Sequence, residues 1–494
     1  MRRPVRLSVG LAAGLCILMP SAASADGSIS IGNSLRYSLS SETNQEILED
    51  YFDADYSHGS FRARLRYEVF QPSEEQRDRE GQVFRAVGGT TTWGSLWVGN
   101  FYELFGRGMA FHGYEDRDLR VDNSLDGVDL NLEHGPVAFQ AFSGKTPGKT
   151  VVLHGMDGDL RLPLGIEAGG SYLSRRQTSS TGYNSPDLEL GTGRMRVTAG
   201  PVDIFVEGGR RSKSSAPEGG RGLFASIGAS VPGAALGLEY KDYRHMGVGA
   251  EGKEYTTPPP ASVEHRWSLL ARHSRDLNAD DERGGLAQLE WQPSGLVGLS
   301  GAFSLTENHD SDRLFDAKRL FSEAMAEARI AELSSTPVTV AAAWTEEFLG
   351  PALTTSGPVD DRREHVTFIA EVTFPVQDPW SGRVSVEHQH TDGDAVGAFD
   401  LEHIEIEASR SPGISIAAVA EFSNVSAMQR DLPWLPVFED ETAWFYLQGI
   451  VDIVRGHQLR VILGSRPQGK VCAGGACRTV PEFKGLEVQL TSMF

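Results

Sequence analysis

Apolar and polar residues alternate with a period of two along most of this chain. At residues 61–69 the sequence reads FRARLRYEV, in which every second position is charged: Arg62, Arg64, Arg66 and Glu68. A two-residue period is typical of a β-strand whose two faces meet different surroundings. In a soluble sheet the apolar face covers a core and the charged face meets water. In a membrane barrel the apolar face meets lipid and the charged face lines a wet interior.

The same alternation recurs to the end of the chain in about 25 segments of roughly 8–13 residues, a length that crosses a bilayer when the strand is tilted. The connections are of two kinds. Short turns rich in glycine and proline, at 58–60, 134–135, 199–201 and 231–233, alternate with long polar loops, at 174–189, 306–319, 424–440 and 465–482. Short turns at one rim and long loops at the other are typical of outer-membrane barrels. The pattern therefore predicts an all-β fold, a transmembrane antiparallel up-and-down β-barrel.

The number of strands is constrained because single-chain bacterial barrels have an even number. Counting forward from residue 28, the strand at 233–243 runs outward, and counting back from Phe494, the segment at 263–272 runs outward too. One crossing must therefore lie within 244–262, either as an irregular strand or as a return of the chain through the lumen. We expect about 26 strands, with 24 as the alternative.

The first residues have the features of a secretory signal peptide. Arg2, Arg3 and Arg6 precede a short apolar run, and an A-x-A cleavage site follows at 23–25. We expect residues 1–25 to be removed and residues 26–494 to form one barrel domain in the cell outer membrane. The chain ends in an alternating segment whose last residue, Phe494, resembles the signal that the outer-membrane assembly machinery reads for insertion.

Charge and cysteine content narrow the possible partners. Without the signal peptide the chain carries 43 basic and 67 acidic residues, a net charge of −24. Such acidity argues against nucleic-acid binding, which needs a basic footprint. Only Cys472 and Cys477 remain after cleavage, and an even pair in an exported chain predicts a disulfide in the last external loop.

No metal site or cofactor is expected from the sequence. The run from Asp276 to Glu282 opens like a calcium loop but lacks the glycine at its sixth position and the carboxylate at its twelfth. His388 and His390 share a strand face without an evident third ligand, which favours a solvated pair in the lumen or at the rim.

Residues 101–127, FYELFGRGMAFHGYEDRDLRVDNSLDG, interrupt the alternation. Such a segment cannot face lipid, where a midplane Arg or Lys costs about 2–4 kcal/mol. Irregular backbone is tolerated at membrane depth only where it lines a cavity or is buried in protein. We therefore expect the segment to fold inward and narrow the lumen, with a salt-bridged external loop as the alternative. Its charged residues are Arg107, Glu115, Asp116, Arg117, Asp118, Arg120 and Asp122.

Two blocks of the sequence resemble an uncharacterised family of Gram-negative outer-membrane, porin-like β-barrel proteins. The first contains GNFYE at 99–103, FGRG at 105–108, YEDR at 114–117 and DNS at 122–124. The second contains PP at 258–259, EH at 264–265, LL at 269–270, RH at 272–273 and DERG at 281–284. The resemblance implies a signal-bearing, porin-like barrel of unassigned substrate, and it supplies no catalytic residues.

The function predicted is passive diffusion of small polar solutes or ions through a wet lumen, with residues 101–127 as the constriction. The predicted lumen residues of the wall are Arg62, Arg64, Arg66, Glu68, Arg383, Glu387, Glu405 and Glu407. Expected partners are outer-membrane lipid and the assembly machinery. Three alternatives stay open: a plugged structural or adhesin barrel, a barrel that sheathes a periplasmic or surface protein, and a hydrolase at the rim. No G-x-S-x-G elbow is present, so we expect no enzyme.

Overall fold

The computed structural model describes residues 27–41, 45–71, 79–177, 187–212, 219–250, 253–273, 280–309, 319–331, 336–354, 357–394, 397–424, 443–473 and 476–494. The predicted signal peptide and most of the calcium-like run at 276–282 lie outside these residues. Within them, no helix is both long and apolar enough to cross a membrane.

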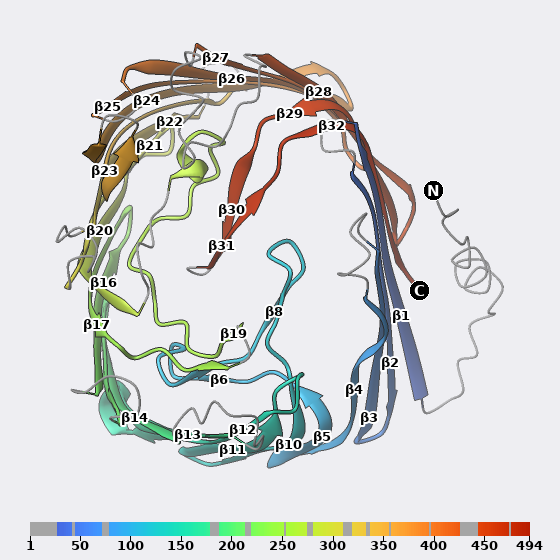
Figure 1. The fold of residues 1–494 in the computed structure, drawn as a ribbon, viewed down its shortest axis with the longest axis vertical. Coiled ribbons are helices and arrows are strands. Elements are labelled where there is room, and N and C mark those ends of the chain that lie inside the picture. The colour runs from blue at the N-terminus through green and yellow to red at the C-terminus, as the bar shows by residue number, and fades with distance from the viewer. Residues whose placement is uncertain are drawn as a thin grey trace.

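Twenty-four antiparallel strands in the described residues form one sheet that closes on itself (Figure 1). Closure joins β1 to β32, and at the seam the Phe494 N–H donates to the Ile31 carbonyl at 2.8 Å. The strands of the wall are β1 (Gly27–Ser40), β2 (Gln45–His58), β3 (Phe61–Gln71), β4 (Arg79–Thr91), β5 (Gly94–Phe101), β10 (Leu125–His134), β11 (Val137–Lys145), β12 (Val151–Leu162), β13 (Ile166–Gln177), β14 (Leu188–Ala199), β15 (Val202–Arg211), β16 (Gly220–Val231), β17 (Ala234–Arg244), β20 (Asp281–Ser294), β21 (Val297–Asn308), β22 (Leu320–Ile330), β23 (Val338–Thr354), β24 (Gly357–Gln377), β25 (Trp380–Gly393), β26 (Phe399–Arg410), β27 (Ile414–Ser423), β28 (Ala443–Val454), β29 (His457–Arg466) and β32 (Phe483–Met493).

The predicted transmembrane barrel is confirmed, and its strand number is the alternative value of 24 rather than 26. The segment at 263–272 is not a strand, because β17 pairs directly with β20 and the chain between them returns through the lumen. The three prolines at 258–260 have no N–H group to give to a ladder. Trp267 and Leu270 pack against the inner wall instead of facing lipid. Their apolar side chains therefore gave this segment the sequence pattern of a membrane strand.

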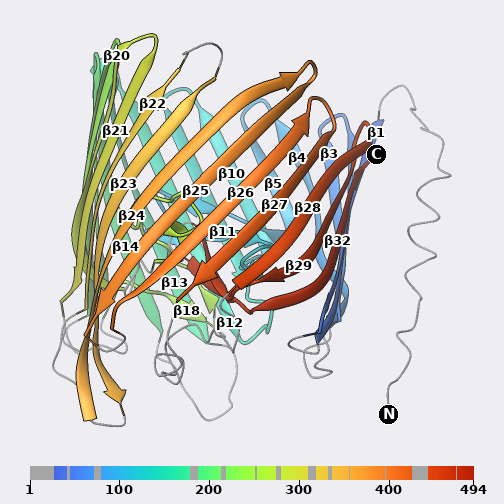
Figure 2. The ribbon, with the colours of Figure 1, turned by 90° about the horizontal axis from the view of Figure 1, so that it is seen from above.

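Tight turns gather at one rim of the barrel, the upper rim in Figure 2. Glycine occupies a left-handed backbone conformation in these turns, with φ of 56° at Gly59, 58° at Gly135 and 60° at Gly200. A side chain would be strained there, whereas glycine is not. The turn residues that the sequence marked thus lie together, and the strand ends on either side of the connections predicted to be long lie at the opposite rim.

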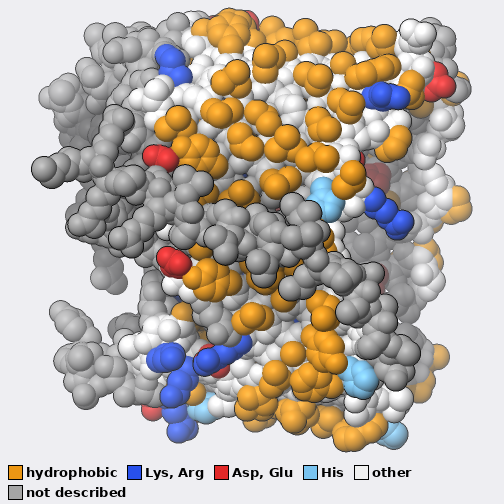
Figure 3. All heavy atoms as spheres, turned by 90° about the vertical axis from the view of Figure 1, so that its right-hand side faces the viewer, with side chains coloured by type: hydrophobic (Ala, Val, Ile, Leu, Met, Phe, Trp, Pro, Cys, Tyr) orange, Lys and Arg blue, Asp and Glu red, His pale blue; other side chains and the backbone are white. Residues whose placement is uncertain are grey.

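The strand at 61–69 has its apolar face outward. Arg66 on β3 contacts Glu115, which belongs to a segment inside the barrel, so the arginines face the lumen. Leu65 and its apolar neighbours on the strand therefore face outward, and Leu65 is 41% exposed. Figure 3 shows the wall on the right-hand side of Figure 1, over which hydrophobic side chains gather. The strand is inside-out relative to a soluble sheet, as a membrane barrel requires.

Replacing Leu65 with arginine is expected to impair assembly into a bilayer. The new cation would face lipid directly opposite Arg85 on β4, which is already paired with Asp126 at 3.8 Å. Repulsion between the two arginines would add to a cost of about 2–4 kcal/mol for a cation near the midplane. The measurement is the fraction of protein that shows heat-modifiable gel migration after refolding into lipid vesicles.

Arg64→Ala is the matched control for this substitution. Arg64 is half exposed on the inner face, 3.2 Å from Asp55 and over the Trp97 ring. Its loss is expected to leave the heat-modifiable fraction unchanged, because a solvated ion pair contributes little. Impaired assembly with Arg64→Ala and normal assembly with Leu65→Arg would contradict the inside-out arrangement.

Candidate functional site

In the described part of the chain, three segments fold from the loop rim into the barrel, where Figure 1 shows them within the ring of strands. The first inner segment, residues 102–124, contains β6 (Leu104–Phe105), β7 (Phe111–His112), β8 (Glu115–Asp116) and β9 (Val121–Asp122). The second, described at residues 245–250, 253–273 and 280, contains β18 (Gly249–Ala250), β19 (Lys253–Glu254) and the short helix η3 (Leu270–Arg272). The third, described at residues 467–473 and 476–482, is the hairpin of β30 (Gly469–Ala473) and β31 (Ala476–Val480).

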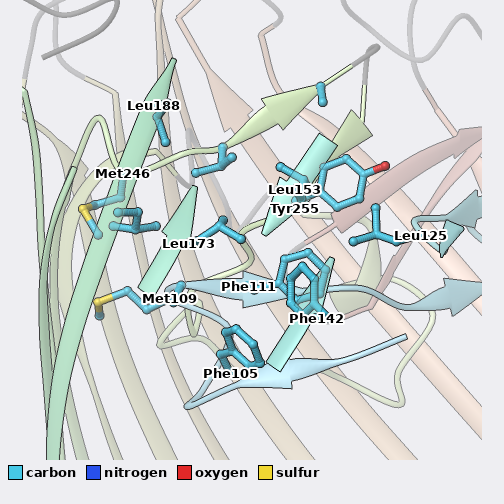
Figure 4. Packing of buried hydrophobic residues seen from close by; sticks show 14 of the residues in the cluster. Phe105, Met109, Phe111, Leu125, Phe142, Leu153, Leu173, Leu188, Met246 and Tyr255 are labelled. Atoms are coloured by element: carbon cyan, nitrogen blue, oxygen red, sulfur yellow. The ribbon is translucent and has the colours of Figure 1, made fainter. Parts of the chain in front are cut away.

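The base of the first inner segment is an apolar core inside the barrel (Figure 4). Phe105 and Phe111 are fully buried, and their ring centroids lie 5.2 Å and 4.5 Å from that of Phe142 on β11. Gly155 on β12 leaves room for these rings, because a Cβ there would lie 2.4 Å from the Phe142 ring. The inward folding expected for residues 101–127 is therefore present, and it rests on aromatic packing as well as on charge.

The tip of the first inner segment is tied to β1, β2 and β3 across the lumen. The ion pairs are Arg36–Asp118 (3.1 Å), Arg66–Glu115 (2.7 Å), Arg117–Asp53 (2.7 Å) and Arg120–Glu49 (2.5 Å). Their side chains are mostly well covered, which reduces solvent screening relative to an exposed surface pair. The structure thus brings together five of the residues singled out in the sequence: Arg66, Glu115, Arg117, Asp118 and Arg120.

The other charged residues of this segment serve its local structure. Asp116 accepts a hydrogen bond from the Leu119 N–H at 2.8 Å, and Asp122 accepts one from the Tyr102 hydroxyl at 3.1 Å. The Arg107 guanidinium lies over the Phe205 ring, 4.3 Å from its centroid. Such a contact attracts the cation to the ring face. These side chains shape the segment rather than forming a single charged ring.

The second inner segment continues the first. The Asn123 side chain donates to the Glu254 carbonyl at 2.6 Å, and His112 contacts the Thr257 hydroxyl. Partial burial lowers the pKa of the His112 imidazole below its ordinary value. Burial also raises the pKa of Asp280 at the far end of the segment, although the Gly247 N–H donates to its carboxylate. The first and second inner segments are therefore joined by direct hydrogen bonds in this half of the lumen.

Residues 265–273 of the second inner segment are anchored on the opposite wall, β22 to β27. Glu387 accepts hydrogen bonds from the N–H groups of Ser268 and Leu269 at 2.9 Å and 2.8 Å. His265 lies 2.7 Å from Glu323, and Arg272 pairs with Glu421. Glu387 is thus on the inner face, as its strand position predicts, but it is buried as an anchor and does not line water.

The remaining predicted lumen residues fall into two groups. Arg383 is surrounded by carboxylates, with Glu371 at 3.2 Å, Glu407 at 2.8 Å and Glu405 also in contact. Arg62 and Arg64 are exposed on the inner wall, whereas Glu68 is buried.

The two histidines on β25 lie away from the lumen. His388 and His390 alternate with the inward-facing Glu387 and Gln389, so they point to the outer face. His390 pairs there with Asp400 at 2.7 Å. The sequence placed this pair in the lumen or at the rim. Its position near the loop-side end of β25 is a rim position.

The third inner segment corrects the placement of the cysteine loop. Cys472 and Cys477 are direct partners in the β30–β31 register, a position that suits the predicted disulfide. By topology the hairpin follows an outward strand, yet it folds into the ring and its first strand contacts η3. The loop is therefore not simply external, and the disulfide stays a prediction.

Two pockets open between the inner segments and the wall. One, of about 640 Å³, lies toward the tight turns and includes Asp157, Asp159, Arg194 and Arg196 in its lining. The other, of about 460 Å³, lies where all three inner segments meet. Five arginines line it: Arg36, Arg120, Arg272, Arg460 and Arg466. Within the described residues, the Nε atoms of four of them are buried without a hydrogen-bond acceptor: Arg36, Arg120, Arg460 and Arg466.

Sequence reasoning missed most of the second pocket. Arg36 and Arg460 sit at inward positions of alternating strands, so the period of two could have identified them. Arg272 could not be found in this way, because it belongs to an irregular segment that was taken for a strand.

The family model described as "Family of unknown function (DUF6029)" matches residues 29–494. The chain belongs to the DUF6029 family. The resemblance of the two sequence blocks to an uncharacterised family of porin-like outer-membrane barrels is thereby confirmed. No curated protein matches the chain.

Several solved outer-membrane structures are similar to this DUF6029 chain. OccK5 (OpdH) of Pseudomonas aeruginosa has 12% sequence identity and a TM-score of 0.42, over 72% of this chain and 99% of that one. OprD of Pseudomonas aeruginosa has 11% identity and a TM-score of 0.41, over 74% and 96%. The translocation pore of the P pilus usher PapC has 9% identity and a TM-score of 0.47, over 94% and 99%. These likenesses are too distant to assign a solute.

Proposed function

We propose that this DUF6029 protein is a porin-like channel for passive diffusion of small polar solutes or ions across the outer membrane. The observation that carries the proposal is the polarity of the inside. Charged side chains of the wall and of the inner segments line both pockets, and four buried arginine Nε atoms have no acceptor among the described residues. Water or a polar solute would satisfy such groups, whereas an apolar filling would leave them unpaired.

The inner segments are proposed to set the size limit of the channel. The first and second inner segments are held to the wall by ion pairs rather than by the strand ladder, so they reduce the free cross-section without breaking the barrel. The arginines where the three segments meet would contact a passing solute and affect its charge preference.

Swelling of proteoliposomes in isotonic solutions of polar solutes of increasing size tests this function. The wild-type protein is expected to permit swelling, at a rate that falls as the solute grows. An Arg117→Ala/Arg120→Ala variant loses two ties of the first inner segment and is expected to admit larger solutes. Arg85→Ala, an exposed arginine on the outer side of β4, is the control and should behave as wild type. Swelling no faster than in protein-free liposomes, for every solute and variant, would contradict a diffusion channel.

A hydrolase is the second candidate because a serine, a histidine and a carboxylate come together. Ser268 Oγ lies 3.4 Å from His403 Nε2, and His403 Nδ1 lies 3.4 Å from Glu421. The neighbouring N–H groups of Ser268 and Leu269 could stabilise an oxyanion, but Glu387 already accepts from both. Because Glu387 occupies the position that an oxyanion would need, we favour diffusion over hydrolysis. Labelling of Ser268 by a fluorophosphonate probe would reverse the ranking.

The proposed partners follow from the surface and the end of the chain. Outer-membrane lipid would cover the apolar outer face, and Phe494 at the barrel seam would present the insertion signal to the assembly machinery. A surface adhesin or a sheath for a periplasmic or surface protein would use the same wall. Neither role accounts for the charged pockets as directly as diffusion does.

A further inference from the structure

Three side chains with metal-binding atoms meet where the second inner segment touches the wall. They are His273, just after η3, Glu347 on β23 and His365 on β24. All three are more than nine-tenths buried. One ligand atom of each lies within 4.8 Å of the others, and His273 Nδ1 lies 3.3 Å from Glu347 Oε1. Tetrahedral zinc bonds of about 2.0–2.1 Å place neighbouring ligand atoms about 3.3 Å apart, so this pair is already spaced as two ligands.

His365 carries an unused ring nitrogen. Its Nδ1 is 2.9 Å from the Thr391 hydroxyl, whereas its Nε2 is buried without a hydrogen-bond partner among the described residues. The ring centroids of His365 and His273 are 4.1 Å apart. A buried polar atom without a partner is costly, and a cation bound at Nε2 would remove that cost. The Thr391 hydroxyl would then orient the ring from behind, as outer partners of metal ligands do.

We propose that His273, Glu347 and His365 bind one divalent transition ion of the zinc class. Two imidazoles and one carboxylate form the His₂Glu set that leaves a fourth position for water. Arg363 is buried and lies opposite Glu347 in the strand register. The donor set holds two imidazole nitrogens and only one carboxylate. This favours an ion that imidazole binds well over Ca²⁺ or Mg²⁺, which need several oxygens.

The site would clamp the second inner segment to the wall. His273 comes from that segment, whereas Glu347 and His365 belong to neighbouring wall strands, so a shared ion joins the two bodies. Gln389 supports the arrangement, since its amide lies 2.9 Å from His273 Nε2 and 2.8 Å from the Thr367 hydroxyl. Rotation of this amide would present its oxygen to the His273 Nε2–H once Nδ1 holds the metal.

Titration of the purified full-length barrel in detergent with Co²⁺, followed by displacement with Zn²⁺, tests the site. Wild-type protein is expected to bind one Co²⁺ per chain with the visible absorption of a four-coordinate ion. His365→Ala and His273→Ala should abolish this absorption, and Gln389→Ala should weaken binding by about 10–100-fold. The double variant His388→Ala/His390→Ala removes a histidine pair on the outer face and is expected to bind as wild type.

Two further readouts separate the site from folding and from chance binding. Heat-modifiable migration should be the same in all variants, because the barrel wall does not depend on the ion. Zn²⁺ should slow proteolysis within residues 253–273 in the wild type and have no effect in His365→Ala. A wild type without stoichiometric Co²⁺, or binding that survives both His365→Ala and His273→Ala, would overturn the proposal. The outcome is independent of whether the barrel conducts.

Discussion

Replacing Phe111 with alanine is expected to release the first inner segment from the wall. Phe111 is fully buried, with Phe142 on one side and Tyr255 of the second inner segment on the other. Loss of a buried phenylalanine side chain costs about 3–5 kcal/mol. The segment opens locally rather than with the barrel, so this cost should appear in its local stability. Tryptic cleavage within residues 105–120 is then expected to accelerate about a hundredfold or more, at 1.4 kcal/mol per factor of ten.

The control for this substitution is Phe139→Ala. Phe139 lies on β11 as Phe142 does, but it is exposed on the outer face. Its removal changes the lipid-facing surface and leaves the inner packing intact, so cleavage of the inner segment should stay slow. Equal acceleration in both variants would contradict the view that the aromatic core holds the segment in the lumen.

Replacing Lys241 with methionine is expected to lower barrel stability more than any surface charge change. Lys241 on β17 and Glu282 on β20 form an ion pair at 2.5 Å, and their side chains are 1% and 0% exposed. Without the lysine, the buried carboxylate of Glu282 loses the Lys241 cation that compensates its charge, which costs about 3–5 kcal/mol. The two strands flank the second inner segment, so its base should loosen as well. The measurement is the midpoint of heat- or urea-induced loss of the compact gel form.

A double variant separates the effect of the uncompensated charge from the effect of changed side-chain packing. Lys241→Met/Glu282→Gln removes both charges and should recover most of the stability, because an uncharged buried pair no longer pays for desolvation. A double variant less stable than Lys241→Met alone would show that the ion pair is not the source of the effect.

The wall of the barrel could be predicted because it depends on short-range sequence patterns, namely the alternation of polar and apolar residues and the glycines of the turns. The alternation at Arg64, Leu65 and Arg66 sets which face meets lipid, and Gly59 or Gly135 marks a turn through its backbone freedom. Both signals lie within a few residues of each other, so no long-range contact is needed to read them. The C-terminal Phe494 was likewise visible, and its place at the seam follows from barrel closure.

The filling of the lumen could be predicted only in part. Charge density showed that residues 101–127 could not face lipid, but it did not show that Phe105 and Phe111 would build a core there. The segment at 263–272 imitated a strand because Trp267 and Leu270 are apolar for a different reason, namely packing on the inner wall. Glu387 was predicted to face water, because its strand position gives the inner face but does not reveal that the second inner segment covers it. Each of these outcomes depends on a contact between parts of the chain that are more than a hundred residues apart or separated by an irregular segment.

The cluster of His273, Glu347 and His365 illustrates the limit most directly. His273 was singled out only as part of the RH pair at 272–273 in the family resemblance, and no spacing motif connects it with Glu347 or His365. Their meeting requires the strand register that places β23 beside β24 and the inward path that carries His273 to the same point. A period-based search finds faces of strands, and it cannot find a site shared by a wall and a segment that crosses the lumen.

Single-channel recording in a planar lipid bilayer tests most directly whether the barrel has a polar lumen that the inner segments narrow. The wild-type protein is expected to conduct in steps, and a variant with residues 104–122 replaced by a short Gly-Ser linker should conduct several times more. The linker is feasible because Phe101 and Leu125 are direct partners in the β5–β10 register. Absence of conductance in both proteins, each shown to be folded by heat-modifiable migration, would contradict the channel and favour a structural barrel.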